Sequence, residues 1–184
     1  MARLLAVFIV IAAVLAPAAI DARGFTGQRR ALISDGATYD GAWVDGKRHG
    51  RGLQIWPNGE RYEGEWRNDK RDGRGVQTFR DHARYDGEWH DDVRTGQGVY
   101  TFANNDRYEG TFVDGRFSGR GIYVWATGQR YVGEWRDGKA HGQGTMTTVD
   151  RHVFAGQWTA GCFHDGGRVQ AVGVTLKECR ARRP

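Results

Sequence analysis

The sequence predicts an all-β fold, an elongated single-layer antiparallel meander of tandem β-hairpins that repeat every 23 residues. The first observation is a set of six aromatic residues with this constant spacing: Tyr39, Tyr62, Tyr85, Tyr108, Tyr131 and Phe154. The second is another aromatic four positions after each of these: Trp43, Trp66, Trp89, Phe112, Trp135 and Trp158. The third is a glycine midway between the two aromatics in every copy. A fixed period of this size is typical of a stacked array of structural repeats.

The aromatic-x-Gly-x-aromatic segment of each unit predicts its first strand. Side chains alternate between the two faces of a strand, so the two aromatics and the glycine lie on the same face. Glycine between two large rings leaves room for a close approach of a neighbouring chain. We therefore expect the second aromatics of successive units to form one row on one face of the sheet.

Turn residues separate the strands at regular intervals. Asp45-Gly46, Asp114-Gly115 and Asp137-Gly138 favour a tight hairpin turn, because these residues tolerate a positive φ. A run rich in β-branched and aromatic residues follows, as in 53–56, and predicts the second strand. A second turn, such as Pro57-Asn58-Gly59, leads into the next unit. Beyond residue 22 no segment shows helical periodicity, so we expect no helix there.

The other face of the first strand carries alternating charges. Arg61, Arg84, Arg107 and Arg130 each precede the repeat tyrosine, and acidic residues follow on the same face. We expect mixed-sign ladders of these side chains across neighbouring strands. Each exposed pair contributes only about 0.2–1 kcal/mol. This pattern favours a solvated face over a binding site.

The overall charge excludes few partners. The chain has 27 basic and 22 acidic residues, a formal net charge of +5, and the two signs are interspersed. Nucleic acid is not an expected partner, because such proteins concentrate positive charge on one surface. An anionic lipid surface is the alternative partner, through basic residues near the predicted hairpin tips. These residues are Lys47, Arg48, Arg51, Lys70, Arg71, Arg74, Arg116 and Arg120.

Residues 1–22 have the composition of a targeting segment. Arg3 precedes an apolar run from Leu4 to Ala16, and small residues follow it. This layout predicts a secretory signal peptide, and hence an exported protein that is periplasmic or secreted. The apolar stretch to Ile20 is close to the shortest length that spans a membrane, so N-terminal membrane anchoring is the alternative.

The two cysteines, Cys162 and Cys179, lie near the C-terminus. In an exported protein they favour one disulfide bond. The segment 168–176 has the composition of one more strand, which the disulfide would fasten to the end of the array. We expect this tail to act as a cap, which repeat arrays generally need.

Segments such as 62–76 and 131–144 resemble the MORN (membrane occupation and recognition nexus) repeat. Five units, residues 39–153, fit its pattern, after a lead-in of residues 23–38. Residues 154–184 keep the beginning of a sixth unit, and we interpret them as a degenerate repeat and C-terminal cap. The resemblance implies successive hairpins in an elongated twisted sheet. It also implies an interaction scaffold, often linked to membranes or phospholipids.

We find no candidate catalytic residue, metal site or cofactor. His49 and His141 occupy equivalent repeat positions, and the carboxylates recur with the repeat instead of forming a unique pair. The Gly-x-Gly pairs lack the lysine and the helix of a phosphate-binding loop. We predict a non-enzymatic interaction or scaffold module of the cell envelope or extracellular space. It would bind a protein or another envelope component through its aromatic-rich face, with weak binding to anionic lipid as the alternative.

Overall fold

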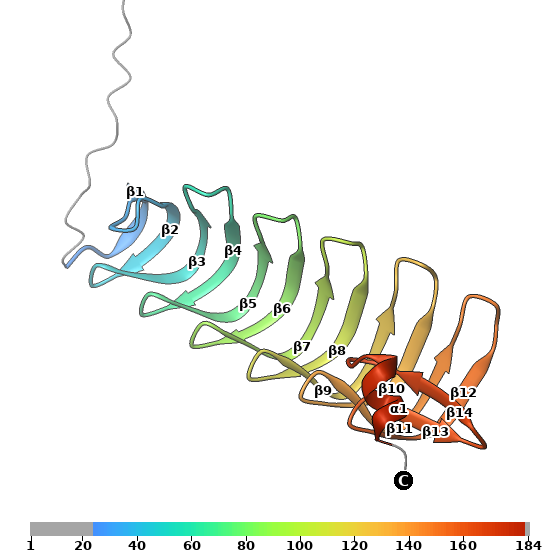
Figure 1. Cartoon of the computed structure of the whole chain (residues 1–184). Helices are drawn as coiled ribbons and strands as arrows, with labels where there is room; N and C mark the ends of the chain where they lie inside the picture. The colour runs from blue at the N-terminus through green and yellow to red at the C-terminus, as the bar shows by residue number, and fades with distance from the viewer. Residues whose placement is uncertain (1–23, 183–184) are drawn as a thin grey trace, which may run out of the picture.

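The structure is a computed structural model that describes residues 24–182. Within this range, 14 strands form one sheet in sequence order, and each strand is antiparallel to the next (Figure 1). The hairpins follow one another along an elongated, curved array. The predicted all-β meander of 23-residue hairpin repeats is confirmed. The predicted signal peptide, residues 1–22, lies outside the described residues.

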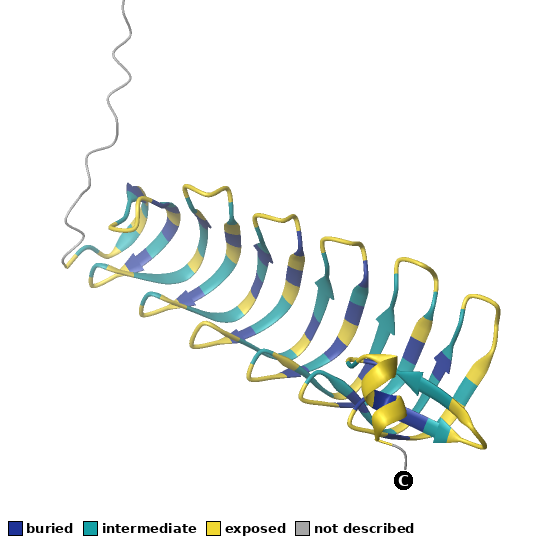
Figure 2. Ribbon diagram, in the orientation of Figure 1, coloured by how far each residue is buried: buried dark blue, intermediate teal, exposed yellow. Residues whose placement is uncertain are grey.

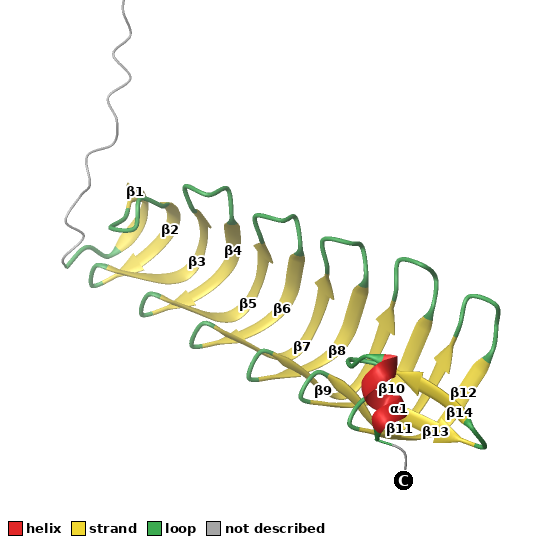
Figure 3. Cartoon of the chain, viewed as in Figure 1, coloured by secondary structure: helices red, strands yellow, loops and turns green. Residues whose placement is uncertain are grey.

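Tight turns and wider turns alternate between the strands (Figure 3). The strands are β1 (Gly27–Leu32), β2 (Thr38–Val44), β3 (Lys47–Ile55), β4 (Arg61–Arg67), β5 (Lys70–Thr78), β6 (Arg84–His90), β7 (Val93–Thr101), β8 (Arg107–Val113), β9 (Arg116–Val124), β10 (Arg130–Arg136), β11 (Lys139–Thr147), β12 (Val153–Thr159), β13 (Cys162–Asp165) and β14 (Arg168–Ala171). Each repeat therefore consists of a seven-residue strand, a tight turn and a nine-residue strand.

The longer strand of each repeat bends at a glycine with a positive φ, for example Gly50 (φ 61°) and Gly73 (φ 100°). The pairing register shifts opposite this point, as at a β-bulge. The Arg48 guanidinium donates to Gln54 Oε1 six residues further along the same strand. An extended strand would separate these residues by about 20 Å. The strand must therefore curve toward the face that carries both side chains, and we call this concave face the trough.

The repeat aromatics lie on the trough face and form the core. The five repeat tyrosines are 0% exposed, and the second aromatics are 5% exposed or less. Figure 2 shows that buried segments recur from one hairpin to the next along the array. The Tyr62 ring makes edge contacts with Trp66 of its own repeat, 5.1 Å between centroids, and with Trp89 of the next repeat, 5.5 Å. The same contacts recur along the array, so the predicted row of aromatics on one face is confirmed.

The repeat glycines make room for the tyrosine rings. A Cβ on Gly75 would overlap the Tyr62 ring, and a Cβ on Gly64 would overlap the backbone of Gly75. The Tyr62 hydroxyl reaches across these glycines and donates to the carbonyl oxygen of Glu65, 3.0 Å away. A single-layer sheet can bury large rings in this way, because the strand curves around them.

Each tight turn is also bonded to the preceding repeat. The amide of Asp69 donates to the carbonyl oxygen of Arg48 (3.0 Å), and the amide of Asp92 to that of Arg71 (3.0 Å). The amides of Gly115 and Gly138 make the equivalent bonds to the carbonyl oxygens of Arg94 and Phe117. The turns are thus fixed in a regular row along one edge of the trough.

The convex face carries the alternating charges, and here the structure corrects the expectation for the arginines that precede the repeat tyrosines. Arg61 pairs with Glu63 (2.6 Å) and Arg84 with Asp86 (2.7 Å), each within one strand instead of across strands. Across the strands, Arg61 faces Ile55 and Thr78. A pair two residues apart on one face of a strand is close enough to form without any partner strand.

The C-terminal residues form a cap that includes a helix. β12 continues the repeat, and β13 and β14 form a short final hairpin. The prediction of no helix beyond the signal was wrong, because α1 (Leu176–Ala181) follows β14. Thr175 and Glu178 form a capping box that starts this helix, a local signal independent of apolar periodicity. The strand predicted for 168–176 accordingly ends at Ala171.

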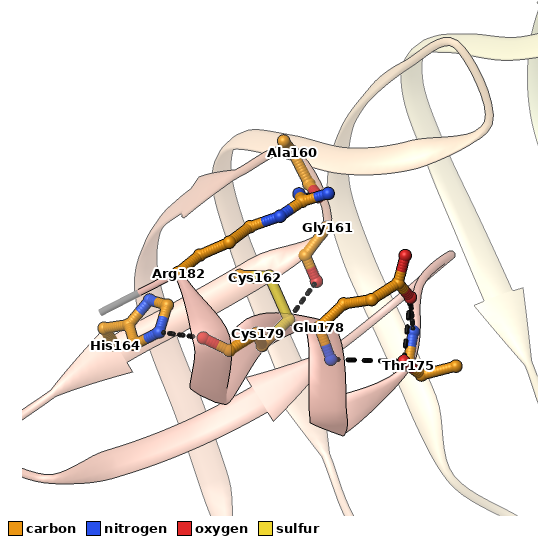
Figure 4. The surroundings of a disulfide bond; sticks show 8 residues. All are labelled: Ala160, Gly161, Cys162, His164, Thr175, Glu178, Cys179 and Arg182. Atoms are coloured by element: carbon orange, nitrogen blue, oxygen red, sulfur yellow. Dashed lines mark hydrogen bonds between the residues drawn. A yellow bond between two sulfur atoms is a disulfide. The ribbon is translucent and has the colours of Figure 1, made fainter. Parts of the chain in front are cut away.

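The predicted disulfide between Cys162 and Cys179 is present and ties α1 to β13 (Figure 4). His164 Nε2 lies 2.9 Å from the carbonyl oxygen of Cys179. Phe163 covers Trp158, with 5.3 Å between ring centroids. The amide of Ala140 donates to the carbonyl oxygen of Val172, so the tail also covers the turn edge of the fifth repeat. The last hairpin is thereby covered by the tail.

Candidate binding surface

The trough presents three rows of side chains beside the buried core. One row follows the tight turns, and the other two lie toward the wide turns. The turn-edge row is Arg48, Arg71, Arg94, Phe117 and Ala140. The middle row is Gln54, Gln77, Tyr100, Tyr123 and Met146. The outer row is Trp56, Phe79, Phe102 and Trp125. The outer row is aromatic throughout, whereas the middle row changes from glutamine to tyrosine at the third repeat and the turn-edge row from arginine to phenylalanine at the fourth.

In the first two repeats the turn-edge arginine has a full set of internal partners. Arg48 Nε donates to Asp69 Oδ1 at 3.1 Å, and its guanidinium lies 4.4 Å from the Trp66 ring centroid. Arg71 donates to Asp92 at 2.9 Å and to Gln77 Oε1 at 3.1 Å. These two guanidinium groups therefore stabilise the trough, and few of their N–H donors remain for another anion.

In the third repeat both side-chain partners of the arginine are replaced. Gly115 stands where Asp69 and Asp92 stand in the earlier repeats, and Tyr100 stands where the glutamines stand. Arg94 keeps a bond from Nη2 to the Gly115 carbonyl oxygen (3.2 Å) and lies 5.1 Å from the Tyr100 ring centroid. Within residues 24–182 it forms no ion pair.

The fourth repeat continues this surface with aromatic side chains. Phe117 takes the arginine position and stacks on Tyr108, with 3.7 Å between centroids and 10° between planes. The Tyr123 hydroxyl donates to Asp106 Oδ2 (2.8 Å). The other oxygen of this carboxylate, Oδ1, accepts from the amide of Ala126 in the wide turn (2.8 Å). A hollow of about 290 Å³ lies beside these rings. It is lined by Arg94, Tyr100, Phe102, Gly115, Arg116, Phe117 and Gly138.

The convex face carries shallow depressions of about 600, 230 and 420 Å³ with repeat glycines in their lining. Two of the glutamates that line them accept hydrogen bonds from the backbone. Glu65 Oε1 accepts from the amide of Arg74 (3.0 Å), and Glu88 Oε1 accepts from the amide of Gln97 (3.1 Å). These carboxylates satisfy backbone groups at the bulges, a role that the repeat spacing did not reveal.

The eight basic residues predicted at hairpin tips do not share one surface. Lys47, Lys70 and Arg116 flank tight turns, whereas Arg48 and Arg71 point into the trough. Arg51, Arg74 and Arg120 lie within strands on the convex face, where Arg51 faces Glu65 and Arg74 faces Glu88. Contact of these residues with an anionic surface stays a prediction, but their charges are interleaved with acidic partners.

The buried tyrosine hydroxyls of the trough serve as structural hydrogen-bond donors. Burial raises the pKa of Tyr85 to about 12 and raises the pKa of Tyr62 further still, so both hydroxyls remain protonated donors at neutral pH. In the described part of the chain, no group of three or more His, Cys, Asp or Glu side chains is arranged to hold a metal ion. No helix among residues 24–182 is long and apolar enough to cross a membrane.

These features define a tandem-hairpin repeat protein with one concave, aromatic-rich face. The MORN repeat family matches residues 39–61, 62–84, 85–107, 108–130 and 131–153, the five units defined by the tyrosine spacing. The match covers more than half of the chain, and the protein belongs to the MORN repeat family. MORN repeats suggest a module that binds protein or membrane.

Other comparisons add little. No curated protein matches this sequence. One solved structure that matches is the TCP domain of SAS-4 (dCPAP) from Drosophila melanogaster, in complex with a proline-rich motif of Ana2 (dSTIL). The identity is 12%, over 70% of this chain and 88% of that chain, with a TM-score of 0.32. This similarity is too low to assign a shared partner or function.

Proposed function

We propose that this protein is a non-enzymatic interaction module that binds a protein or another envelope component in its trough. The observation that supports this most is the run of half-buried aromatics left on the trough face of repeats three and four, including Tyr100, Phe102, Tyr123 and Trp125. Half-buried aromatic side chains on a rigid concave surface are typical of binding sites. These rings pack against the core on one side and remain only partly buried, so the rest of their surface is available to a partner.

We further propose that the protein acts outside the cytoplasm, in the periplasm or the extracellular space. A disulfide that joins the cap is typical of proteins in oxidising compartments. The N-terminal segment supports the same location through its composition. N-terminal anchoring in a membrane is the alternative to release from it.

The anionic-lipid alternative receives less support. Its basic residues are spread over the turn edge, the trough and the convex face, and Lys70 lies 3.6 Å from Asp91. A flat membrane contacts a concave face poorly. Flotation with anionic and neutral vesicles at low and high salt tests the alternative, which requires salt-sensitive binding to the anionic vesicles alone.

Two adjacent residues on opposite faces provide the main test. Trp125 lies on the trough face, and Val124 lies on the convex face of the same hairpin. Partner capture from an envelope extract would be compared for the wild type, Trp125→Ala and Val124→Ala. We expect Trp125→Ala to reduce capture at least about tenfold, in line with the loss of an aromatic anchor, and Val124→Ala to retain it.

Circular dichroism and the melting temperature of each variant would establish that the array is folded. Equal capture by a folded Trp125→Ala variant would contradict binding in the trough. Loss of capture in Val124→Ala alone would move the site to the convex face.

A further inference from the structure

We infer that the third repeat holds a specific anion-binding site, in which Arg94 receives a carboxylate from an extended polypeptide partner. This inference rests on the proposed function and adds the chemistry of the partner. The repeat itself supplies the argument, because the same arginine position occurs three times with different surroundings. In two copies a carboxylate of this chain occupies the site, and in the third the carboxylate is missing.

The internal carboxylates show how the site is filled. Asp69 accepts from both the side chain and the backbone amide of Arg48, at 3.1 and 2.9 Å. Asp92 does the same for Arg71, at 2.9 and 3.0 Å. An arginine guanidinium and an adjacent amide thus form a ready-made carboxylate receptor.

At Arg94 the receptor is present without its carboxylate. Gly115 has φ 75°, and Asp69 and Asp92 both have φ 70°, so the turn keeps the same backbone conformation. A Cβ on Gly115 would meet only Arg94 Nη2, at 3.7 Å, and Arg94 Nε, at 4.0 Å. The space for a carboxylate is therefore open. A half-buried guanidinium without a counter-charge favours an anion from outside.

The surroundings of Arg94 specify what accompanies the carboxylate. The hollow beside it is lined by the rings of Tyr100, Phe102 and Phe117. Its volume of about 290 Å³ is at the lower limit of small-molecule pockets, which suits one apolar side chain. The trough continues from the hollow toward the first two repeats, so an extended segment can lie along it, whereas the tail covers the turn edge on the other side at Ala140. The expected motif is an Asp or Glu beside an aromatic or large aliphatic residue.

The test uses two pools of short peptides with acetylated N-termini and amidated C-termini. One pool carries a central Glu next to Phe, Leu or Trp, and the other carries Gln in place of Glu. Retention of each pool on the purified protein would be measured by mass spectrometry. We expect the Glu pool to be retained about tenfold better than the Gln pool, the factor that one charge-assisted hydrogen bond supplies.

Four variants assign the effect to this site. Arg94→Gln should abolish the preference for Glu, whereas Arg61→Gln should keep it, because Arg61 lies on the convex face and pairs with Glu63. Gly115→Asp should abolish the preference by supplying the missing carboxylate, and Gly115→Asn should keep it. The last two variants introduce side chains of the same size at the same φ, so backbone strain is matched.

Three results would overturn the inference. These are equal retention of the two pools, no retention of either pool, and a Glu preference that survives in folded Arg94→Gln. Uptake by anionic vesicles that is lost in Arg94→Gln, without peptide retention, would assign the site to lipid phosphate instead. If the pools fail while Trp125→Ala still loses its partner, this inference falls and the proposed function stands.

Discussion

The indole nitrogen of Trp66 donates to the carbonyl oxygen of Gly52, 3.3 Å away and fourteen residues earlier in the chain. Trp89 makes the same bond to Gly75 at 3.2 Å, and Trp158 to Gly144 at 3.1 Å. Each bond joins one repeat to the glycine-rich strand of the preceding repeat. The tryptophans therefore connect neighbouring hairpins by both ring packing and hydrogen bonding.

Truncating a repeat tyrosine should destabilise the array strongly. Tyr62→Ala removes a ring that is 0% exposed and packed against two tryptophans, and we expect a loss of about 3–5 kcal/mol in the free energy of unfolding. Tyr62→Phe keeps the ring and removes only the hydroxyl bond to Glu65, so it should cost about 1 kcal/mol. Urea unfolding followed by tryptophan fluorescence measures both values. Equal losses would show that the hydroxyl bond, and not ring packing, dominates.

A methyl group on a repeat glycine should be tolerated only outside the core. Gly75→Ala places a Cβ against the Tyr62 ring, and we expect it to cost about 1–3 kcal/mol through overpacking. Gly59→Ala is the control, because a Cβ there meets nothing within 4 Å and adds only the strain of its positive φ (88°). Thermal unfolding of the two variants provides the comparison. A larger loss for Gly59→Ala would contradict the tight contact between tyrosine and glycine.

Alkaline pH should unfold the protein through its tyrosines. Burial raises the pKa of Tyr85 from 10.0 to about 12, because the protein interior disfavours the phenolate. The folded state then holds a proton that the unfolded state has released. Stability is therefore unaffected below pH 10 and falls as the pH rises toward 12, by about 1.4 kcal/mol per pH unit for each such group. A titration of tyrosinate absorbance against circular dichroism should show ionisation and unfolding together, and ionisation well before unfolding would refute this account.

Removing the disulfide should loosen the cap and leave the repeats folded. The bond joins residues 17 apart in sequence, and a loop of this size contributes about 3 kcal/mol in the chain-entropy model. We expect a Cys162→Ala, Cys179→Ala double variant to lose protection from hydrogen exchange first in β13, β14 and α1. Thiol counting on protein purified from an oxidising compartment should find no free thiol. Two free thiols in that folded protein would show that no disulfide holds the cap in place.

The same double variant, which lacks the disulfide, also tests whether the cap protects the end of the sheet. Because β12 would become an open sheet edge once the tail detaches, the double variant should associate more readily than the wild type. Size-exclusion chromatography over a range of concentrations measures this. Unchanged association would indicate that β12 is protected without the tail.

The sequence by itself determined the architecture of the repeats. Tyrosine, glycine and tryptophan at a fixed spacing specify a strand, its buried face and its register, because each hairpin repeats the local chemistry of the last. The strict period also predicted that Trp66 and Trp89 would occupy equivalent places in one row. The pairing of Cys162 with Cys179 followed from their being the only two cysteines.

The tertiary structure decided the features that depend on curvature and on departures from the repeat. The sequence pattern placed Arg48 and Arg71 at exposed tips, but the bend at each glycine turns them into the trough, where they meet aspartates 21 residues away. The helix α1 depends on a local capping box and not on periodicity. The Arg94 site was missed for a related reason: the replacement of Asp by Gly115 is visible in the sequence, but its meaning depends on the arginine that the missing carboxylate would have met. Local patterns determine which face a residue lies on, and only the packing of one repeat on the next decides which charges are paired.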